Sequence, residues 1–231
     1  MNDTYKCALI VGAGAGLSAS LARVFSNSGM TIALAARTTD KLGPLVKDIG
    51  AKTFACDASR QDEVERLFAA LDDTGTPDVV VYNASYRTRG PLAELDAVEV
   101  DKALRITAYG GFLVAQAAVR RMLPRGYGAV LFTGASASVK GYAQSAPFAM
   151  GKFALRGLAQ SMARELLPRG IHVAHVVIDG GIRSARRLEA ADATDSLLDP
   201  DAIAQNYLHL LRQPRSAWTH EIEVRPWVER F

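Results

Sequence analysis

The chain has 231 residues, of which 49% are hydrophobic and 22% are charged, and its formal net charge is only +3. This length and composition suit one globular domain, 1–231, with a large core. The basic residues are scattered along the chain, which argues against a nucleic-acid partner. No apolar stretch is long enough to cross a bilayer, which argues against a membrane protein.

The cysteines and histidines do not form a pattern typical of a metal site. Cys7 and Cys56 each lie in a short apolar stretch, and the four histidines lack metal-ligand spacing. We therefore expect buried thiols in a reducing compartment, and no metal. A strand-like run begins at Cys7, which leaves no room for a signal peptide before it. These features predict a cytoplasmic location.

Short β-branched, apolar runs alternate with longer amphipathic segments along the chain. This alternation is typical of βαβ units and predicts a Rossmann-type, doubly wound α/β fold. The expected sheet has seven strands and is mostly parallel, with helices on both faces. In chain order, the predicted strands are Cys7–Val11, Thr31–Ala35, Thr53–Cys56, Val79–Tyr82, Ala129–Phe132, His172–Ile178 and Glu221–Val224.

Residues typical of helix ends lie between these strands. Ser59 and Asp96 each precede an acidic residue by three positions, and Asp199 precedes a proline, so all three are predicted helix N-caps. Glycines punctuate the expected helix ends just before the next strand, at Gly29, Gly50, Gly75 and Gly170.

The first predicted strand runs directly into a glycine-rich loop and then into an amphipathic helix. Glycines allow the backbone to approach a pyrophosphate, and a helix N-terminus offers free N–H groups and a positive dipole end. A structural turn alone would also use glycines, but the position after the first strand favours nucleotide binding. The predicted contacts in this loop are Gly12, Gly14, Ala15, Gly16 and Leu17.

The end of the second strand indicates which dinucleotide is bound. Its last residues are Ala36, Arg37 and Thr38, where an acidic residue would bind the ribose 2′-hydroxyl of NAD. The planar guanidinium of Arg37 instead suits the 2′-phosphate of NADP. The alternative is that Arg37 is a solvated residue at the start of the next helix, or only stacks on adenine. We expect NADP, with NADPH preferred over NADH.

With these features, the chain resembles the short-chain dehydrogenase/reductase family over essentially its whole length. Gly12, Gly16 and Ser18 resemble its Gly-x-x-x-Gly-x-Gly loop, with Ser18 at the third glycine. Residues 151–158 resemble its active-site helix, and residues 179–184 resemble its Pro-Gly-x-Ile-x-Thr segment, which receives the nicotinamide. The resemblance implies further cofactor contacts from Asp57, Ala58, Asn83, Ala84, Ser85, Lys152, Gly180 and Ile182.

The resemblance also implies where catalytic residues should lie, and the sequence departs from the family there. In the family a Tyr transfers the proton, a Lys lowers its pKa, a Ser orients the carbonyl and an Asn completes a proton relay. Lys152 follows this pattern, but the Tyr, Ser and Asn positions hold Phe148, Ala135 and Thr107. The candidate replacements are, for the Ser, Ser136 or Ser138 and, for the proton donor, Tyr142, Tyr109, Tyr86 or Lys152 itself acting through water.

The function implied is hydride transfer between NADP(H) and a small carbonyl, alcohol or enone/enoyl substrate. Reduction of an enone depends least on the tyrosine proton, because polar donors can stabilise the enolate and solvent can protonate it. A degenerate tetrad beside an intact cofactor loop is equally typical of a catalytically inactive NADP(H)-binding sensor or scaffold.

The resemblance further implies a homodimer or homotetramer, with an apolar face at Phe112, Ala115, Ala118, Val119 and Met122 that core packing would explain equally well. The polar stretch 181–198 is expected to form a substrate-side loop or short helix over the site. Its Arg183, Arg186 and Arg187 hint at an acidic substrate group, although a solvated loop is the simpler reading. Residues 225–231 are expected to form a tail that docks on a neighbouring subunit or over a pocket.

Overall fold

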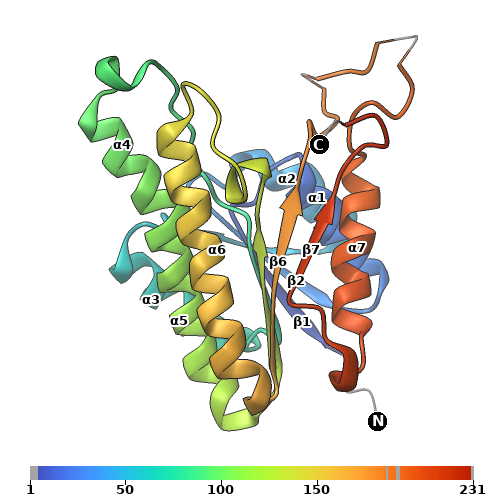
Figure 1. Cartoon of the computed structure of the whole chain (residues 1–231). Helices are drawn as coiled ribbons and strands as arrows, with labels where there is room; N and C mark the ends of the chain where they lie inside the picture. Colours follow the sequence, from blue (N-terminus) through green and yellow to red (C-terminus); the bar gives the residue numbers. More distant parts are fainter. Residues whose placement is uncertain (1–4, 186, 191–192, 230–231) are drawn as a thin grey trace.

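The computed structural model of the chain describes residues 5–185, 187–190 and 193–229. At its centre is a sheet of seven parallel strands in the order β3-β2-β1-β4-β5-β6-β7. Helices cover both faces of this sheet (Figure 1), so the predicted Rossmann-type α/β fold is confirmed. The strands are β1 (Cys7–Val11), β2 (Thr31–Ala36), β3 (Lys52–Ala55), β4 (Val79–Tyr82), β5 (Gly128–Thr133), β6 (Ile171–Ile178) and β7 (Glu221–Val224).

The helices divide between the two faces of the sheet. One face carries α1 (Leu17–Asn27), α2 (Gly43–Ile49) and α7 (Pro200–Arg212). The other carries α3 (Gln61–Thr74), α4 (Ala97–Leu104), α5 (Gly110–Met122) and α6 (Ala146–Leu166). The five inner strands are buried on both faces and are therefore almost continuous apolar runs, as in other parallel sheets, whereas the edge strands β3 and β7 are partly exposed.

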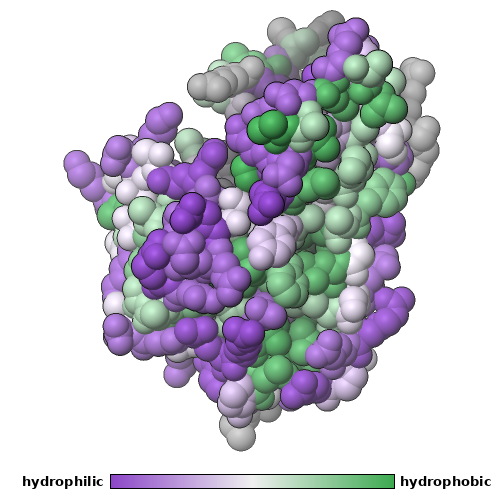
Figure 2. All heavy atoms as spheres, turned by 90° about the vertical axis from the view of Figure 1, so that its left-hand side faces the viewer, coloured by the Kyte–Doolittle hydropathy of each residue, from purple (hydrophilic) through white to green (hydrophobic). Residues whose placement is uncertain are grey.

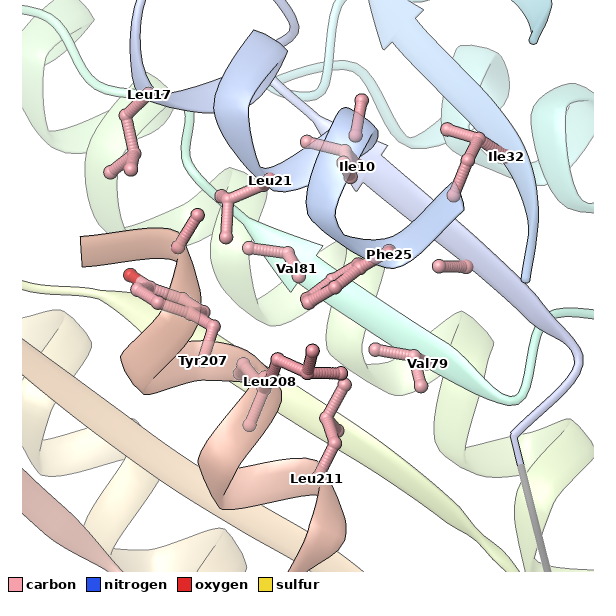
Figure 3. Close-up of a cluster of buried hydrophobic side chains, with 14 of the residues drawn as sticks. Ile10, Leu17, Leu21, Phe25, Ile32, Val79, Val81, Tyr207, Leu208 and Leu211 are labelled. Atoms are coloured by element: carbon pink, nitrogen blue, oxygen red, sulfur yellow. The ribbon is translucent and has the colours of Figure 1, made fainter. Parts of the chain in front are cut away.

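Each face of the sheet has its own hydrophobic core, because side chains alternate in direction along a strand. In β1, Ile10 belongs to the core under α1 and α7, whereas Leu9 belongs to the core under α3, α5 and α6. Figure 3 shows the first core, where Phe25 of α1 and Tyr207 of α7 lie together with Val81 of β4. These contacts hold α1, and therefore the loop that precedes it, in a fixed position on the sheet.

Two of the three predicted helix caps are confirmed. The Asp96 carboxylate accepts a hydrogen bond from the Val98 N–H at 2.9 Å, and Asp199 caps α7 in the same way. Ser59 is not a cap, because its N–H and hydroxyl both donate to the carboxylate of Asp57, at 3.0 and 2.7 Å. Helix α3 begins two residues later, with no side-chain cap. The four predicted helix-ending glycines all have positive φ.

The helical face around α5 and α6 carries exposed apolar side chains. Tyr109, Phe112, Met150 and Phe153 are each at least 40% exposed. Figure 2 shows the side of the molecule formed by α3, α4 and α5, where apolar side chains form a band between polar ones. Most of the apolar face expected on α5 belongs instead to the core, since its members Ala115, Ala118 and Met122 are buried.

The described parts of the 181–198 stretch contain no helix. Its two ends meet in a bridge between Ile182 and Leu198, and the Arg183 N–H donates to the Leu198 carbonyl oxygen at 2.8 Å. Arg186 lies outside the described residues. The tail turns back beside this stretch, with Pro226 buried next to Gly180. Trp227 is 80% exposed, and Arg230 and Phe231 lie outside the described residues.

Within the described ranges, no helix is both long and apolar enough to span a membrane. Both cysteines are free, and Cys56 is buried as predicted, but Cys7 is partly exposed because it begins its strand near the rim of the sheet.

Candidate active site

Three cavities lie at the edge of the sheet where the parallel strands end. In open α/β sheets this edge binds ligands where the strand order reverses, which here is between β1 and β4. The first and second cavities measure about 320 Å³ each and share Asn83 and Ser85. The third, about 250 Å³, shares Ala135, Ile178 and Gly180 with the second. The three therefore form one continuous cleft.

Two residues of the glycine-rich loop, Gly12 and Ala13, line the first cavity. Gly12 has φ +85°, and a Cβ on it would lie 2.4 Å from the Ala84 nitrogen, so only glycine fits there. Gly14 and Gly16 have open space where a Cβ would point. Gly16 caps α1 without any side-chain hydrogen bond, and the first turn of α1 holds no acidic residue. This loop therefore leaves room for a pyrophosphate at a positive helix end.

Ser18 fixes this loop to the turn after β4. Its hydroxyl donates to the Gly12 carbonyl oxygen at 3.0 Å and accepts from the Asn83 side-chain amide at 2.7 Å. A third glycine could make neither bond. Ser18 therefore connects the loop after β1 to the turn after β4 through hydrogen bonds that a glycine at this position could not make. Helix α1 begins at Leu17, directly after the glycine-rich loop.

The first cavity brings together residues from the ends of β1, β2, β3 and β4. Arg37 follows β2 directly, is exposed, and lies outside any helix, since α2 begins only at Gly43. The carboxylate of Asp57 is oriented by the N–H and hydroxyl of Ser59. The predicted cofactor-binding residues that line this cavity are Gly12, Arg37, Thr38, Asp57, Ala58, Asn83, Ala84 and Ser85.

The second cavity contains the only buried lysine among the described residues. Lys152 is 3% exposed, and its ammonium donates to the Thr133 carbonyl oxygen at 2.6 Å. Burial, with a contribution from the positive charge of Arg87, lowers the pKa of Lys152 to about 8. The predicted residues that join Lys152 in this cavity are Leu17, Asn83, Ser85, Gly180 and Ile182.

Phe148 lies one helical turn before Lys152, so the two side chains share a face of α6. The Phe148 ring is buried and lines the second cavity. The Lys152 ammonium is 5.8 Å from the centre of this ring, and the guanidinium carbon of Arg87 is 4.1 Å from it. Both cations therefore lie within about 6 Å of the centre of this ring.

The two predicted catalytic hydroxyls lie in the third cavity, whereas Lys152 lies in the second. Ser136, in a 3₁₀ turn, hydrogen-bonds to Asp179, and Tyr142 is 51% exposed. Ala135 occupies the position beside Lys152. The alternative, Ser138, is buried, and its hydroxyl accepts from the Ala135 N–H at 3.1 Å.

The other tyrosines considered as proton donors are engaged elsewhere. The Tyr86 hydroxyl donates to Glu99 and accepts from the Lys102 ammonium at 3.3 Å. Tyr109 stacks on Phe112 on the outer helical face. Neither tyrosine lines the second cavity, whose ionisable side chains among the described residues are Lys152 and Arg187.

Thr107 lies in a π-helical turn, Arg105–Tyr109, that joins α4 to α5. Its hydroxyl accepts from the Tyr86 N–H at 3.3 Å, and its side chain packs against Gly151 of α6, where a Cβ would lie 2.9 Å away. A wide turn of this kind often marks a functional position in a helix. Here the threonine is completely buried and joins α4, α6 and the loop after β4.

The structure adds residues that the sequence pattern did not identify. Asp179, 1% exposed, pairs with Lys140 and with Arg225, each at 3.1 Å. Burial raises the pKa of Asp179, but hydrogen bonds from Ser136 and Lys140 outweigh it and hold the pKa below its usual value. Arg87 was not predicted either, although its position just after the Asn83 turn indicates that it lies at the same edge of the sheet as the site.

Comparison with known proteins agrees with this arrangement. Residues 6–193 match the model of the family described as short chain dehydrogenase. An uncharacterized oxidoreductase of Staphylococcus aureus (strain N315) is 26% identical over 230 residues, covering 96% of this chain and 98% of the relative.

Two solved structures share the fold over almost the whole chain. A short-chain dehydrogenase from Rhodopseudomonas palustris is 36% identical, with a TM-score of 0.84 and coverage of 96% of this chain and 99% of that one. A metagenomic short-chain oxidoreductase in complex with NADP is 27% identical, with a TM-score of 0.83 and coverage of 96% and 98%. The chain therefore belongs to the short chain dehydrogenase family of oxidoreductases.

Proposed function

We propose that this oxidoreductase is a single dinucleotide-binding domain that uses NADP(H) and a small carbonyl, alcohol or enone/enoyl substrate, with a degenerate catalytic tetrad. The observation that carries the proposal is the buried ammonium of Lys152, held on the Thr133 carbonyl oxygen in a cavity continuous with the glycine-rich loop. A buried cation of this kind is costly, and such groups are typical of functional sites.

The residues present fit a dinucleotide. The open space at Gly14 and Gly16 and the uncapped start of α1 suit the pyrophosphate. Arg37 and Thr38 suit a ribose 2′-phosphate, and the NADP complex of the metagenomic relative supports the same choice. Asp57 and Ala58 are proposed to contact the adenine side. When bound, the reduced cofactor supplies a hydride.

Reduction of a carbonyl also requires a proton, and Lys152 is the proposed source. With a pKa of about 8, the side chain is largely an ammonium at neutral pH and yet far more acidic than a solvated lysine. Donation breaks an N–H bond of Lys152, forms the O–H bond of the alcohol and leaves a neutral amine, which solvent reprotonates. The Thr133 carbonyl oxygen orients the ammonium during this step.

Phe148 is proposed to occupy the position of the missing tyrosine. It shares a face of α6 with Lys152 and lines the same cavity. A phenyl ring has no proton to give, so its contribution is to exclude water and raise the acidity of Lys152 by desolvation. An enone substrate remains the least demanding choice, because its protonation does not need a tyrosine.

The proposal is tested by titrating the purified protein with NADPH and NADH, followed by nicotinamide fluorescence, and by a turnover screen of enones and carbonyls. Tight NADPH binding with turnover is expected. NADPH binding without any turnover across the screen would favour the alternative, an inactive sensor or scaffold, which no other observation favours. Binding of neither dinucleotide would overturn the cofactor assignment.

A homodimer or homotetramer is proposed for the assembled protein. The exposed apolar side chains of Phe112 on α5 and of Met150 and Phe153 on α6 support this, because water-exposed apolar groups of this size gain by association. Light scattering on the purified protein tests it, and a monomer at micromolar concentration would overturn it.

A further inference from the structure

Three arginines from two separate segments of the chain line the second and third cavities. Arg87 and Arg89 follow β4 and line the third cavity, and Arg187 of the substrate-side stretch lines the second. Arg87 joins the two cavities, because its guanidinium covers the Phe148 ring that lines the second. Partial burial lowers the pKa of Arg87, and the charges of Arg89 and Arg187 lower it further, so the three positive charges lie close enough to repel one another.

These arginines lack the counter-charge that other arginines of the molecule have. Among the described residues, no carboxylate lies within 4.0 Å of Arg87, Arg89 or Arg187, whereas Arg183 of the same stretch pairs with Asp199 and Glu189. The described residues that line the second and third cavities include no Asp or Glu. The carboxylate of Asp179 behind Ser136 is already neutralised by Lys140 and Arg225.

The remaining lining of the third cavity also suits an anion. Ser145 lies at the N-terminus of the 21-residue helix α6, and its side chain does not cap that helix. The positive end of the helix dipole therefore faces the cavity that the arginines line. Tyr142 and Ser136 add hydroxyl groups at the same place. Guanidinium groups with neighbouring hydroxyls are the usual ligands of carboxylate and phosphate oxygens.

We infer that the third cavity is a subsite for an oxyanion of the substrate, held by Arg87 and Arg89, with Arg187 of the adjoining second cavity adding positive charge, so that the enzyme acts on acidic small molecules. This inference deepens the proposed function and rests on it for the position of the reacting carbon in the second cavity. A carboxylate or a phosphate supplies the same chemistry, and the experiment separates the two.

Binding is measured by isothermal titration calorimetry with succinate, inorganic phosphate and the uncharged succinamide, in the presence of saturating NADP⁺. The variants are Arg87→Gln, Arg89→Gln and Arg187→Gln. Arg120→Gln, an exposed arginine near the end of α5, is the control with the same change of charge. The expected result is binding of at least one anion, weakened about tenfold or more by the cavity variants, as for the loss of a charge-assisted bond, but unchanged in the control.

Which anion binds identifies the group, since succinate without phosphate assigns a carboxylate and the reverse assigns a phosphate. Succinamide binding as tightly as either anion, or equal affinities in all variants, would overturn the inference. The proposed function is tested separately on the same samples by NADPH titration in anion-free buffer. Wild-type NADPH binding without anion binding refutes only the subsite. Anion binding by the wild type without any NADPH binding refutes only the cofactor assignment.

Discussion

The guanidinium carbon of Arg87 lies over the buried ring of Phe148, 4.1 Å from the centre of the ring. A residue of the loop after β4 thus contacts the residue of α6 that lies one turn before Lys152. The contact joins the wall of the second cavity to that of the third and puts a fixed positive charge near the lysine. It therefore couples the proposed proton donor to the proposed substrate subsite.

A hydroxyl added at this ring should restore tyrosine-type catalysis. Phe148→Tyr is expected to raise kcat for carbonyl reduction by roughly 10²-fold, because a positioned acid contributes about that much. Steady-state kinetics on a ketone and on an enone measure the effect, which should be larger for the ketone. Phe153→Tyr, at an exposed position of the same helix, is the control. Equal kinetics in all three proteins would show that position 148 does not reach the reacting oxygen.

The pH dependence of turnover should report Lys152. If its ammonium donates the proton, kcat for reduction stays level at neutral pH and falls as the pH rises through about 8. Lys152→Met should abolish the fall together with most of the activity and should weaken NADPH binding. Circular dichroism establishes that the variant folds. A wild-type profile that is flat up to pH 10 would exclude the lysine as the acid.

The same lysine should affect stability in a defined pH window. Its pKa is 10.5 when unfolded and about 8 when folded, so between these values the unfolded state binds more protons. Stability attributable to Lys152 therefore rises with pH across the window. Relative to Lys152→Met, the wild type should gain up to roughly 3 kcal/mol from pH 8 to 10.5, at about 1.4 kcal/mol per pKa unit. Urea denaturation at each pH measures it, and a constant difference contradicts the burial effect.

Arg37 should determine the choice of dinucleotide. Arg37→Ala is expected to weaken NADPH binding by about tenfold or more, because it removes a charge-assisted bond, while NADH binding changes little. Fluorescence titrations with both cofactors measure the ratio. An equal loss for the two would mean that Arg37 contacts the adenine or the pyrophosphate rather than a 2′-phosphate.

Gly12 and Gly14 should respond differently to alanine. Gly12→Ala forces a positive φ on a side chain and a clash with Ala84, so it should destabilise the fold by roughly 1–3 kcal/mol or more. Gly14→Ala has open space, and it should keep its melting temperature but lose affinity for NADPH. Thermal denaturation and titration together separate the two effects. A stable Gly12→Ala protein would contradict the close packing of β1 against the turn after β4.

The sequence predicts the sheet well because its signals are local. The five inner strands are buried apolar runs, and the Asp96 and Asp199 caps act within their own turns. The predicted N-cap at Ser59 was wrong because Asp57, only two residues away, accepts hydrogen bonds from both the N–H and the hydroxyl of Ser59.

The environment of the site depends on contacts between distant segments, which no local pattern encodes. The low pKa of Lys152 requires burial by several elements, and the stacking of Arg87 joins parts of the chain far apart in sequence. The glycine-rich loop and Arg37 could be proposed as cofactor contacts from the sequence alone, because the proposal depends only on their residue types and their order along the chain.

The ion pairs of Asp179 with Lys140 and Arg225, and the bridge between Ile182 and Leu198, hold both ends of the stretch 181–198. The residues between Ile182 and Leu198 are thus joined to the rest of the fold at two fixed positions. The length and residues of this segment can change in evolution, or be exchanged by engineering, while the frame that holds the lysine and the glycine-rich loop stays the same. The substrate preference proposed for this stretch could therefore change while the proposed catalytic lysine and glycine-rich loop stay in place.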